Sequence, residues 1–204
     1  MFKTKFFLLL IFSVIMISFF ASLAFAKDLV RIVDGNKALK GKPAPRFIIE
    51  TMNGKEWSLQ DFKDKKAVVI SFWATWCEPC LLELPNLQKF YEKYSDSVEV
   101  IAISEDAKNH RKLVENKVKE LGLTFPIAMD SEKKLQKKIY FSRQIPYLIM
   151  IDKEGNVLKL QQGSPHPEKL IEELEELFGD SIKPNIKTSA EAAAGESAPK
   201  EASE

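Results

Sequence analysis

Apolar residues recur along the chain in two different spacings, which predict alternating strands and helices between about residues 41 and 179. The apolar, β-branched run at 67–73 is typical of a strand buried on both faces of a sheet, and the run at 98–103 predicts a second buried strand. Each run is followed by a stretch with helical spacing. The resulting order of strand, helix, strand, helix predicts an α/β fold.

Four helices are predicted from these patterns. The first begins at Cys77, with apolar side chains close to one face, and Pro85 is expected to kink it. A charged amphipathic helix ends at Gly122, and another runs over about 132–139. The last helix covers 167–179, from a proline to a glycine, and its outer face is rich in glutamate.

Two β-hairpins are predicted from short apolar runs that flank turn residues. The first joins 47–49 to 57–59 through an Asn-Gly turn, and we expect this N-terminal hairpin to cover a sheet edge. The second joins 147–151 to 157–160 through a turn that contains glycine, and the chain enters it through Pro146.

The first 26 residues resemble an export signal. Two lysines precede an uncharged, largely apolar run at 6–20, and Ala24 and Ala26 match the small-x-small pattern for cleavage before Lys27. The segment 6–26 is also long enough to span a bilayer, so a retained N-terminal membrane anchor is the alternative. Both versions predict an exported protein, in the periplasm or on the outer face of the cytoplasmic membrane.

Composition limits the remaining possibilities. A chain of 204 residues with 45% hydrophobic residues can bury one ordinary core, which we place at 41–179. Residues 184–204 are mostly Ala, Glu, Ser, Lys and Pro, which predicts a disordered low-complexity tail. The formal net charge is +1, and because residues 1–26 hold two lysines and no acid, their removal leaves −1. Nothing in this balance favours nucleic acid as a partner.

The chain has two cysteines, Cys77 and Cys80, at the point where a buried strand gives way to a helix. This position places Cys77 among the unpaired backbone N–H groups of a helix N-terminus, which stabilise a thiolate. Two intervening residues bring both sulfurs onto the first turn, so Cys80 can attack a mixed disulfide formed on Cys77. We therefore predict Cys77 as the nucleophile and Cys80 as the resolving thiol.

The two residues between the cysteines are expected to tune this chemistry. Pro79 lacks an N–H and has a φ that suits the first helical turn. Glu78 adds a negative charge beside Cys77, which opposes formation of the thiolate. A strongly oxidising enzyme would avoid such a charge.

Two other uses of the cysteines are conceivable from the sequence. They could form a purely structural disulfide, or they could bind zinc together with His110 and His166. The histidines lack the close spacing of small zinc sites, and Leu81 excludes a Cys-x-x-Cys-His haem attachment. We therefore expect neither a metal nor a cofactor.

Taken together, several motifs identify the chain as similar to the TlpA/ResA-like branch of the thioredoxin superfamily, close to the cytochrome-c-maturation thioredoxins. The resemblance covers about residues 41–178. The resemblance rests on five motifs, which are Gly41-Lys42-Pro43-Ala44-Pro45-Arg46-Phe47, Phe72-Trp73-Ala74-Thr75-Trp76-Cys77-Glu78-Pro79-Cys80, Glu83-Leu84-Pro85, Ile145-Pro146 and Ile151-Asp152-Lys153-Glu154-Gly155. The resemblance implies a thioredoxin fold, with a central mixed β-sheet flanked by helices and an N-terminal β-hairpin extension.

The same resemblance implies roles for residues outside the cysteine motif. Pro146 is expected to be cis and to face the cysteines, with the backbone of Ile145 pairing with an extended substrate peptide. Glu83 is expected to point inward as a proton acceptor for the resolving thiol, its pKa raised by burial. Trp76 offers an apolar rim for a substrate. Tyr147 stands where the family usually has a small Thr, and we expect it to narrow the substrate groove.

The function implied by the resemblance is reduction of disulfides in exported proteins, with apocytochrome c among the substrates and a membrane thiol-transfer protein as electron donor. A peroxiredoxin-like peroxidase is a second hypothesis. The motif of a peroxidatic cysteine has Thr or Ser three residues upstream and Pro seven residues upstream. This chain has Ala74 and Ile70 there. A non-catalytic thioredoxin-fold interaction module is the third.

Overall fold

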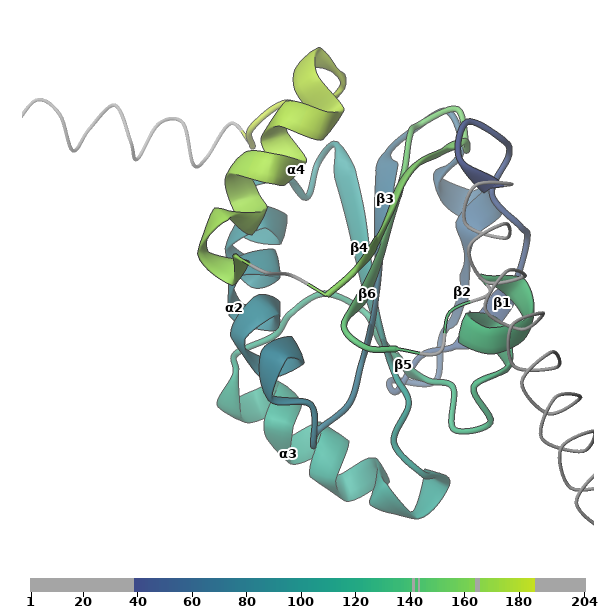
Figure 1. Ribbon diagram of the computed structural model, residues 1–204, viewed down its shortest axis with the longest axis vertical. Helices are drawn as coiled ribbons and strands as arrows, with labels where there is room; N and C mark the ends of the chain where they lie inside the picture. Colours follow the sequence, from purple (N-terminus) through teal and green to yellow (C-terminus); the bar gives the residue numbers. More distant parts are fainter. Residues whose placement is uncertain (1–38, 141, 143, 164–165, 186–204) are drawn as a thin grey trace, which may run out of the picture. The chain divides into compact units, whose positions relative to one another are not determined.

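A five-stranded mixed sheet lies at the centre of the computed structural model, which describes residues 39–140, 142, 144–163 and 166–185 (Figure 1). The strands, in the order in which they lie side by side, are β5 (Ile127–Met129), β4 (Val98–Ser104), β3 (Ala67–Trp73), β6 (Tyr147–Ile151) and β7 (Val157–Gln162). β4 runs parallel to β3 and β5, whereas β6 runs antiparallel to β3 and β7. The α/β, thioredoxin-like sheet is therefore confirmed.

Helices cover one face of the sheet and a hairpin covers the other (Figure 1). The helices are α2 (Glu78–Tyr94), α3 (Arg111–Glu120) and α4 (Leu170–Phe178), and their buried side chains share one core cluster with alternate residues of β3 and β4. The remaining strand residues face a second core cluster. Every residue of β3 and β4 is buried, and both strands are accordingly apolar in sequence except at Ser71, Glu99 and Ser104.

The predicted N-terminal hairpin is present as antiparallel strands β1 (Ile48–Glu50) and β2 (Glu56–Ser58). An isolated bridge from Thr51 to Ala128, and a 2.7 Å hydrogen bond from the Met52 amide to the Ile127 carbonyl, attach it to β5. β5 is the edge strand of the central sheet. Besides lying over one face of the sheet, the hairpin thus also covers a sheet edge, as its sequence predicts.

The folded unit extends further along the chain after α4 than composition predicts. The side-chain amide of Asn185 donates to the Glu92 carbonyl at 2.7 Å, and its backbone amide donates to the Lys93 carbonyl at 2.8 Å. The last carbonyls of a helix need hydrogen-bond donors from outside the helix, and Asn185 supplies two such donors to the C-terminal end of α2. A disordered tail from residue 184 is therefore wrong for residues 184–185, while 186–204 lie outside the described residues, as does the predicted export segment.

Three further elements differ from their sequence-based predictions. β5 was not predicted at all, and the helix expected over 132–139 is a short π-helical turn, Leu135–Ile139. The last helix begins with a 3-10 turn, Pro167–Lys169, before α4. Other 3-10 turns lie at Leu59–Phe62, Lys108–His110 and Gly179–Ser181. Among the described residues, no helix has the length and apolar character needed to cross a membrane.

Candidate active site

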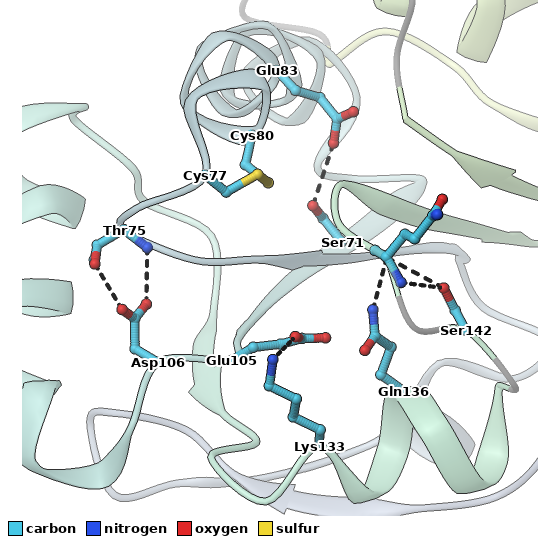
Figure 2. The surroundings of a disulfide bond; sticks show 11 residues. Ser71, Thr75, Cys77, Cys80, Glu83, Glu105, Asp106, Lys133, Gln136 and Ser142 are labelled. Atoms are coloured by element: carbon cyan, nitrogen blue, oxygen red, sulfur yellow. Dashed lines mark hydrogen bonds and ion pairs between the residues drawn. A yellow bond between two sulfur atoms is a disulfide. The ribbon is translucent and has the colours of Figure 1, made fainter.

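Cys77 and Cys80 are joined by a disulfide at the junction between β3 and α2 (Figure 2). Cys77 is the N-cap residue of α2, and its side chain makes no capping hydrogen bond. Both cysteines are nearly buried, at 5% and 1% exposure. A reduced Cys77 would therefore lie at the positive end of the helix dipole, beside first-turn amides that no side chain caps. This arrangement favours a thiolate at Cys77.

The loop that precedes Cys77 is held by Asp106, which follows β4 and is 1% exposed. Its carboxylate accepts the Thr75 amide at 2.9 Å and the Thr75 hydroxyl at 2.7 Å (Figure 2). The Ser104 hydroxyl also donates to it, at 2.7 Å. Three donors to one buried carboxylate hold the chain in place two residues before the reactive cysteine.

Glu83 lies one helical turn beyond Cys80 and is fully buried. Burial raises its pKa from 4.5 to about 7, against a smaller lowering by the Ser71 hydroxyl, which donates to Oε1 at 3.5 Å. The other oxygen, Oε2, has no hydrogen-bond partner among the described residues. The carboxyl points inward toward β3, as the resemblance implies (Figure 2).

Trp76 is the most exposed aromatic side chain beside the disulfide, at 64%. The ammonium of Lys133 lies 5.8 Å from the centre of its ring and 2.8 Å from Oε2 of Glu105, which is itself 5% exposed. The Glu105 carboxylate thereby holds Lys133 against one face of the indole. The other surfaces of Trp76 remain open to a partner.

The peptide bond between Ile145 and Pro146 is cis, in agreement with the resemblance. Pro146 is buried, and its carbonyl accepts the Gly163 amide at 2.8 Å. Ile145 is half-buried and packs against the core cluster that contains both cysteines. The structure therefore brings the loop before β6 to the same part of the molecule as Cys77 and Cys80.

Tyr147 does not line this site. Its side chain is fully buried on the opposite face of the sheet, where its ring centre lies 6.3 Å from that of Phe72. Its hydroxyl donates to the Tyr140 carbonyl at 3.2 Å. Successive side chains of a strand point to opposite faces, so the residue after Pro146 is directed away from the cysteines. The prediction that Tyr147 narrows the substrate groove is wrong.

Other predicted residues are located without being tested for function. Glu78 and Pro79 are both exposed in the first turn of α2, so the roles given to them remain predictions. His110 and His166 are both exposed. Across the ranges that the structure describes, no group of three or more His, Cys, Asp or Glu side chains is arranged to hold a metal ion.

Sequence reasoning missed Asp106, Lys133 and Gln136, each far from the cysteine motif in the chain. It also missed Ser71, although a sequence signal was present. Ser71 is the single hydroxyl residue in the otherwise apolar run of β3, and it lies where Glu83 needs a polar neighbour. Gln136 is fully buried in the π-helical turn and donates to the Gln144 carbonyl at 2.8 Å.

The known proteins that this chain resembles include thiol-disulfide oxidoreductases, in agreement with the geometry of this site. The model of the Redoxin family matches residues 39–177. The thiol-disulfide oxidoreductase ResA of Bacillus thuringiensis subsp. konkukian (strain 97-27) is 38% identical over 138 residues, which cover 67% of this chain and 78% of that protein.

Two solved structures are also similar. The crystal structure of StoA from Bacillus subtilis has a TM-score of 0.50 at 30% identity and covers 63% of this chain and 95% of that one. The putative thiol:disulfide interchange protein DsbE from Chlorobium tepidum has a TM-score of 0.58 at 27% identity, over 70% of this chain and 96% of its own. With its Cys77–Cys80 disulfide at the start of α2, the chain belongs to the Redoxin family and is a thiol-disulfide oxidoreductase.

Proposed function

We propose that this oxidoreductase works as a disulfide reductase on exported proteins. The observation that carries the proposal is the pairing of a helix N-terminal disulfide, Cys77–Cys80, with a buried carboxyl, Glu83, one turn further along α2. The first feature supplies a nucleophile and a leaving group. The second supplies a proton acceptor for the thiol that must complete the reaction.

The reaction runs in two balanced steps. The Cys77 thiolate attacks one sulfur of the substrate disulfide, so that a mixed disulfide forms and one substrate thiolate leaves. Cys80 then loses its proton to Glu83 and attacks the sulfur of Cys77, which releases the second substrate thiolate and forms the Cys77–Cys80 disulfide. Two electrons pass from the enzyme dithiol to the substrate.

Glu83 suits the second step because its pKa is raised by burial to about 7. A carboxyl with its ordinary pKa would be a weak base toward a thiol, whereas one near neutrality accepts the proton more readily while still being largely ionised at slightly alkaline pH. Its complete burial also keeps water from competing for that proton. We therefore assign to Glu83 the role of proton acceptor.

The substrate that fits this site is an extended peptide segment carrying a disulfide. Within the described residues, the backbone N–H and C=O of Ile145 make no hydrogen bond, so both are available to pair with a peptide backbone. Trp76, the residue before Cys77, adds an exposed apolar surface. Apocytochrome c, whose haem-binding cysteines must be reduced, is the specific substrate that we propose.

Turnover requires an external donor, because each cycle leaves the enzyme oxidised. We propose that a membrane thiol-transfer protein returns two electrons and two protons to the Cys77–Cys80 pair at the outer face of the cytoplasmic membrane. The composition of residues 1–26, either as a cleaved signal or as a retained anchor, supports this location.

Trapping of the mixed disulfide tests the proposed reaction. The full chain carrying Cys80→Ser is mixed with an oxidised Cys-x-x-Cys-His peptide, and adducts are measured by mass spectrometry under non-reducing conditions. We expect a one-to-one adduct with this variant and none with Cys77→Ser, because only Cys77 attacks substrate. Adducts through Cys80 alone, or none with either variant, would contradict the proposal. Cell fractionation of the full chain tests its export.

A further inference from the structure

The carbonyls of Gln144 and Pro146, the residues on either side of Ile145, both accept hydrogen bonds, whereas the N–H and C=O of Ile145 make none with the residues that the structure describes. The carbonyl of Gln144 accepts the side-chain amide of Gln136 at 2.8 Å and the hydroxyl of Ser142 at 3.2 Å. The carbonyl of Pro146 accepts the Gly163 amide at 2.8 Å. This segment is therefore fixed on both sides of Ile145, whose N–H and C=O have no partner in the described part of the chain.

Gln136 reaches this segment from the π-helical turn Leu135–Ile139, which lies on the hairpin side of the sheet (Figure 1). The backbone carbonyl of Gln136 accepts the Ser142 amide at 3.0 Å, so both its main chain and its side chain hold the loop. Asp130 anchors the start of the turn by accepting the Lys134 and Leu135 amides at 2.9 and 2.8 Å. Turns of this rare type are frequent at functional sites.

The amide of Gln136 is not explained by stability alone. The side chain is fully buried, and its Oε1 has no hydrogen-bond partner among the described residues. A buried acceptor without a partner destabilises the folded state, and an apolar side chain of the same length would avoid that cost. What an apolar side chain lacks is the N–H donor that holds the Gln144 carbonyl.

We propose that Gln136 is a positioning residue for substrate, which fixes the Gln144 carbonyl so that Ile145 meets the backbone of an incoming peptide in a defined orientation. This inference rests on the proposed function, because it assumes that the substrate is a peptide that pairs with Ile145. The contribution is specific to peptide disulfides. A small disulfide without a peptide backbone makes no use of the Ile145 amide and carbonyl.

The variant Gln136→Met tests this assignment, since methionine keeps the length of the side chain and removes both the donor and the unpaired acceptor. We expect the KM for an oxidised Cys-x-x-Cys-His peptide to rise about fivefold or more, as for the loss of one hydrogen bond. The kcat for the peptide and the rate with bis(2-hydroxyethyl) disulfide are expected to stay within about twofold of the wild-type values.

Gln88 provides a matched control because it is also a buried glutamine with hydrogen bonds to another segment. Its amide donates to the Thr124 hydroxyl at 2.8 Å, and its Oε1 accepts the Thr124 amide at 2.8 Å. Gln88→Met therefore disturbs a comparable contact between α2 and the loop after α3. We expect it to leave the peptide KM unchanged. A second test variant, Ser142→Ala, removes the other donor to the Gln144 carbonyl and should raise the peptide KM in the same direction.

Three results would overturn the assignment. These are an unchanged peptide KM in both Gln136→Met and Ser142→Ala, an equal loss of rate with the small disulfide, or an equal KM increase in Gln88→Met. Failure of the proposed function gives a different result. In that case the wild-type chain itself, once reduced, does not reduce the peptide disulfide.

Discussion

The hydroxyl of Ser71, in the middle of the central strand β3, lies 3.5 Å from Oε1 of Glu83 on the helix that carries the cysteines. It is the hydrogen-bond partner that the described residues give to this carboxyl, whose Oε2 has none. Because the charged form of this carboxyl group is so poorly solvated, the group keeps its proton to higher pH than usual, which accounts for a pKa near 7. Glu83 is thus poised to change its charge near neutral pH.

Replacement of this carboxyl should change the pH dependence of catalysis. As pH rises through about 7, Glu83 becomes ionised and able to accept the proton of Cys80, so the rate of mixed-disulfide resolution should rise through the same range. Glu83→Gln cannot accept that proton, and we expect resolution to slow about 10²-fold at pH 8. Stopped-flow kinetics of peptide reduction between pH 5 and 9 measures this. An unaltered pH profile in the variant would remove Glu83 from the mechanism.

The same raised pKa predicts a change in stability with pH. Between pH 4.5 and about 7 the folded protein keeps a proton on Glu83 that the unfolded chain releases, so the free energy of unfolding falls as pH rises through this window. The shift in pKa corresponds to about 3 kcal/mol, lost in full above pH 7.

Glu83→Gln does not titrate, so we expect the oxidised variant to be more stable than the wild type at pH 8 by up to about 3 kcal/mol, with a smaller difference at pH 4. Urea unfolding of both oxidised proteins at the two pH values gives the comparison. A constant difference between them at pH 4 and pH 8 would show that Glu83 does not carry this proton.

The Asp106 carboxylate should determine how tightly the loop before Cys77 is held. Asp106→Ala removes the acceptor of the Thr75 amide, so hydrogen exchange at that amide should accelerate at least about tenfold. The free energy of unfolding should fall by about 1.5–3 kcal/mol, the usual range for hydrogen bonds to a charged group. The exposed Asp180 is the control, and Asp180→Ala should leave exchange at Thr75 unchanged. Slow exchange at Thr75 in Asp106→Ala would refute this account of the loop.

The two tryptophans Trp76 and Trp57 should respond in opposite ways to truncation. Trp76 is 64% exposed beside the disulfide, so Trp76→Ala should change the free energy of unfolding by no more than about 1 kcal/mol. It should raise the KM for a peptide disulfide about fivefold or more. Trp57 is 4% exposed between the hairpin and the sheet, and Trp57→Ala should cost about 3–5 kcal/mol. A normal peptide KM in Trp76→Ala would rule out the indole as a substrate contact.

Most of the fold could be predicted from the sequence because its central strands are unusually apolar. β3 was predicted with the bounds that the structure shows, and β4 is one residue longer than predicted. β5 was missed, since three residues flanked by Pro126 and Asp130 carry no periodic signal, and only pairing with β4 makes them a strand. The π-helical turn was likewise read as an ordinary helix, because a single widened turn leaves the apolar spacing nearly unchanged.

The candidate site was predictable only where its residues are close in sequence. Cys77, Cys80 and Glu83 lie on consecutive turns of one helix, so their spacing alone brings them together. Asp106 and Gln136 reach the site through strand pairing and loop contacts that no local pattern encodes. The prediction for Tyr147 fails because it rests on a family position alone, whereas strand alternation directs that side chain to the other face of the sheet.

The reduction potential of the Cys77–Cys80 couple tests most directly whether this enzyme is a reductase. The full chain is equilibrated with defined thiol–disulfide buffers, and tryptophan fluorescence reports the redox state because Trp76 precedes the disulfide. The proposed function predicts a potential near or below about −250 mV, in the range of thioredoxin. A value near about −120 mV would identify an oxidant and contradict the proposal.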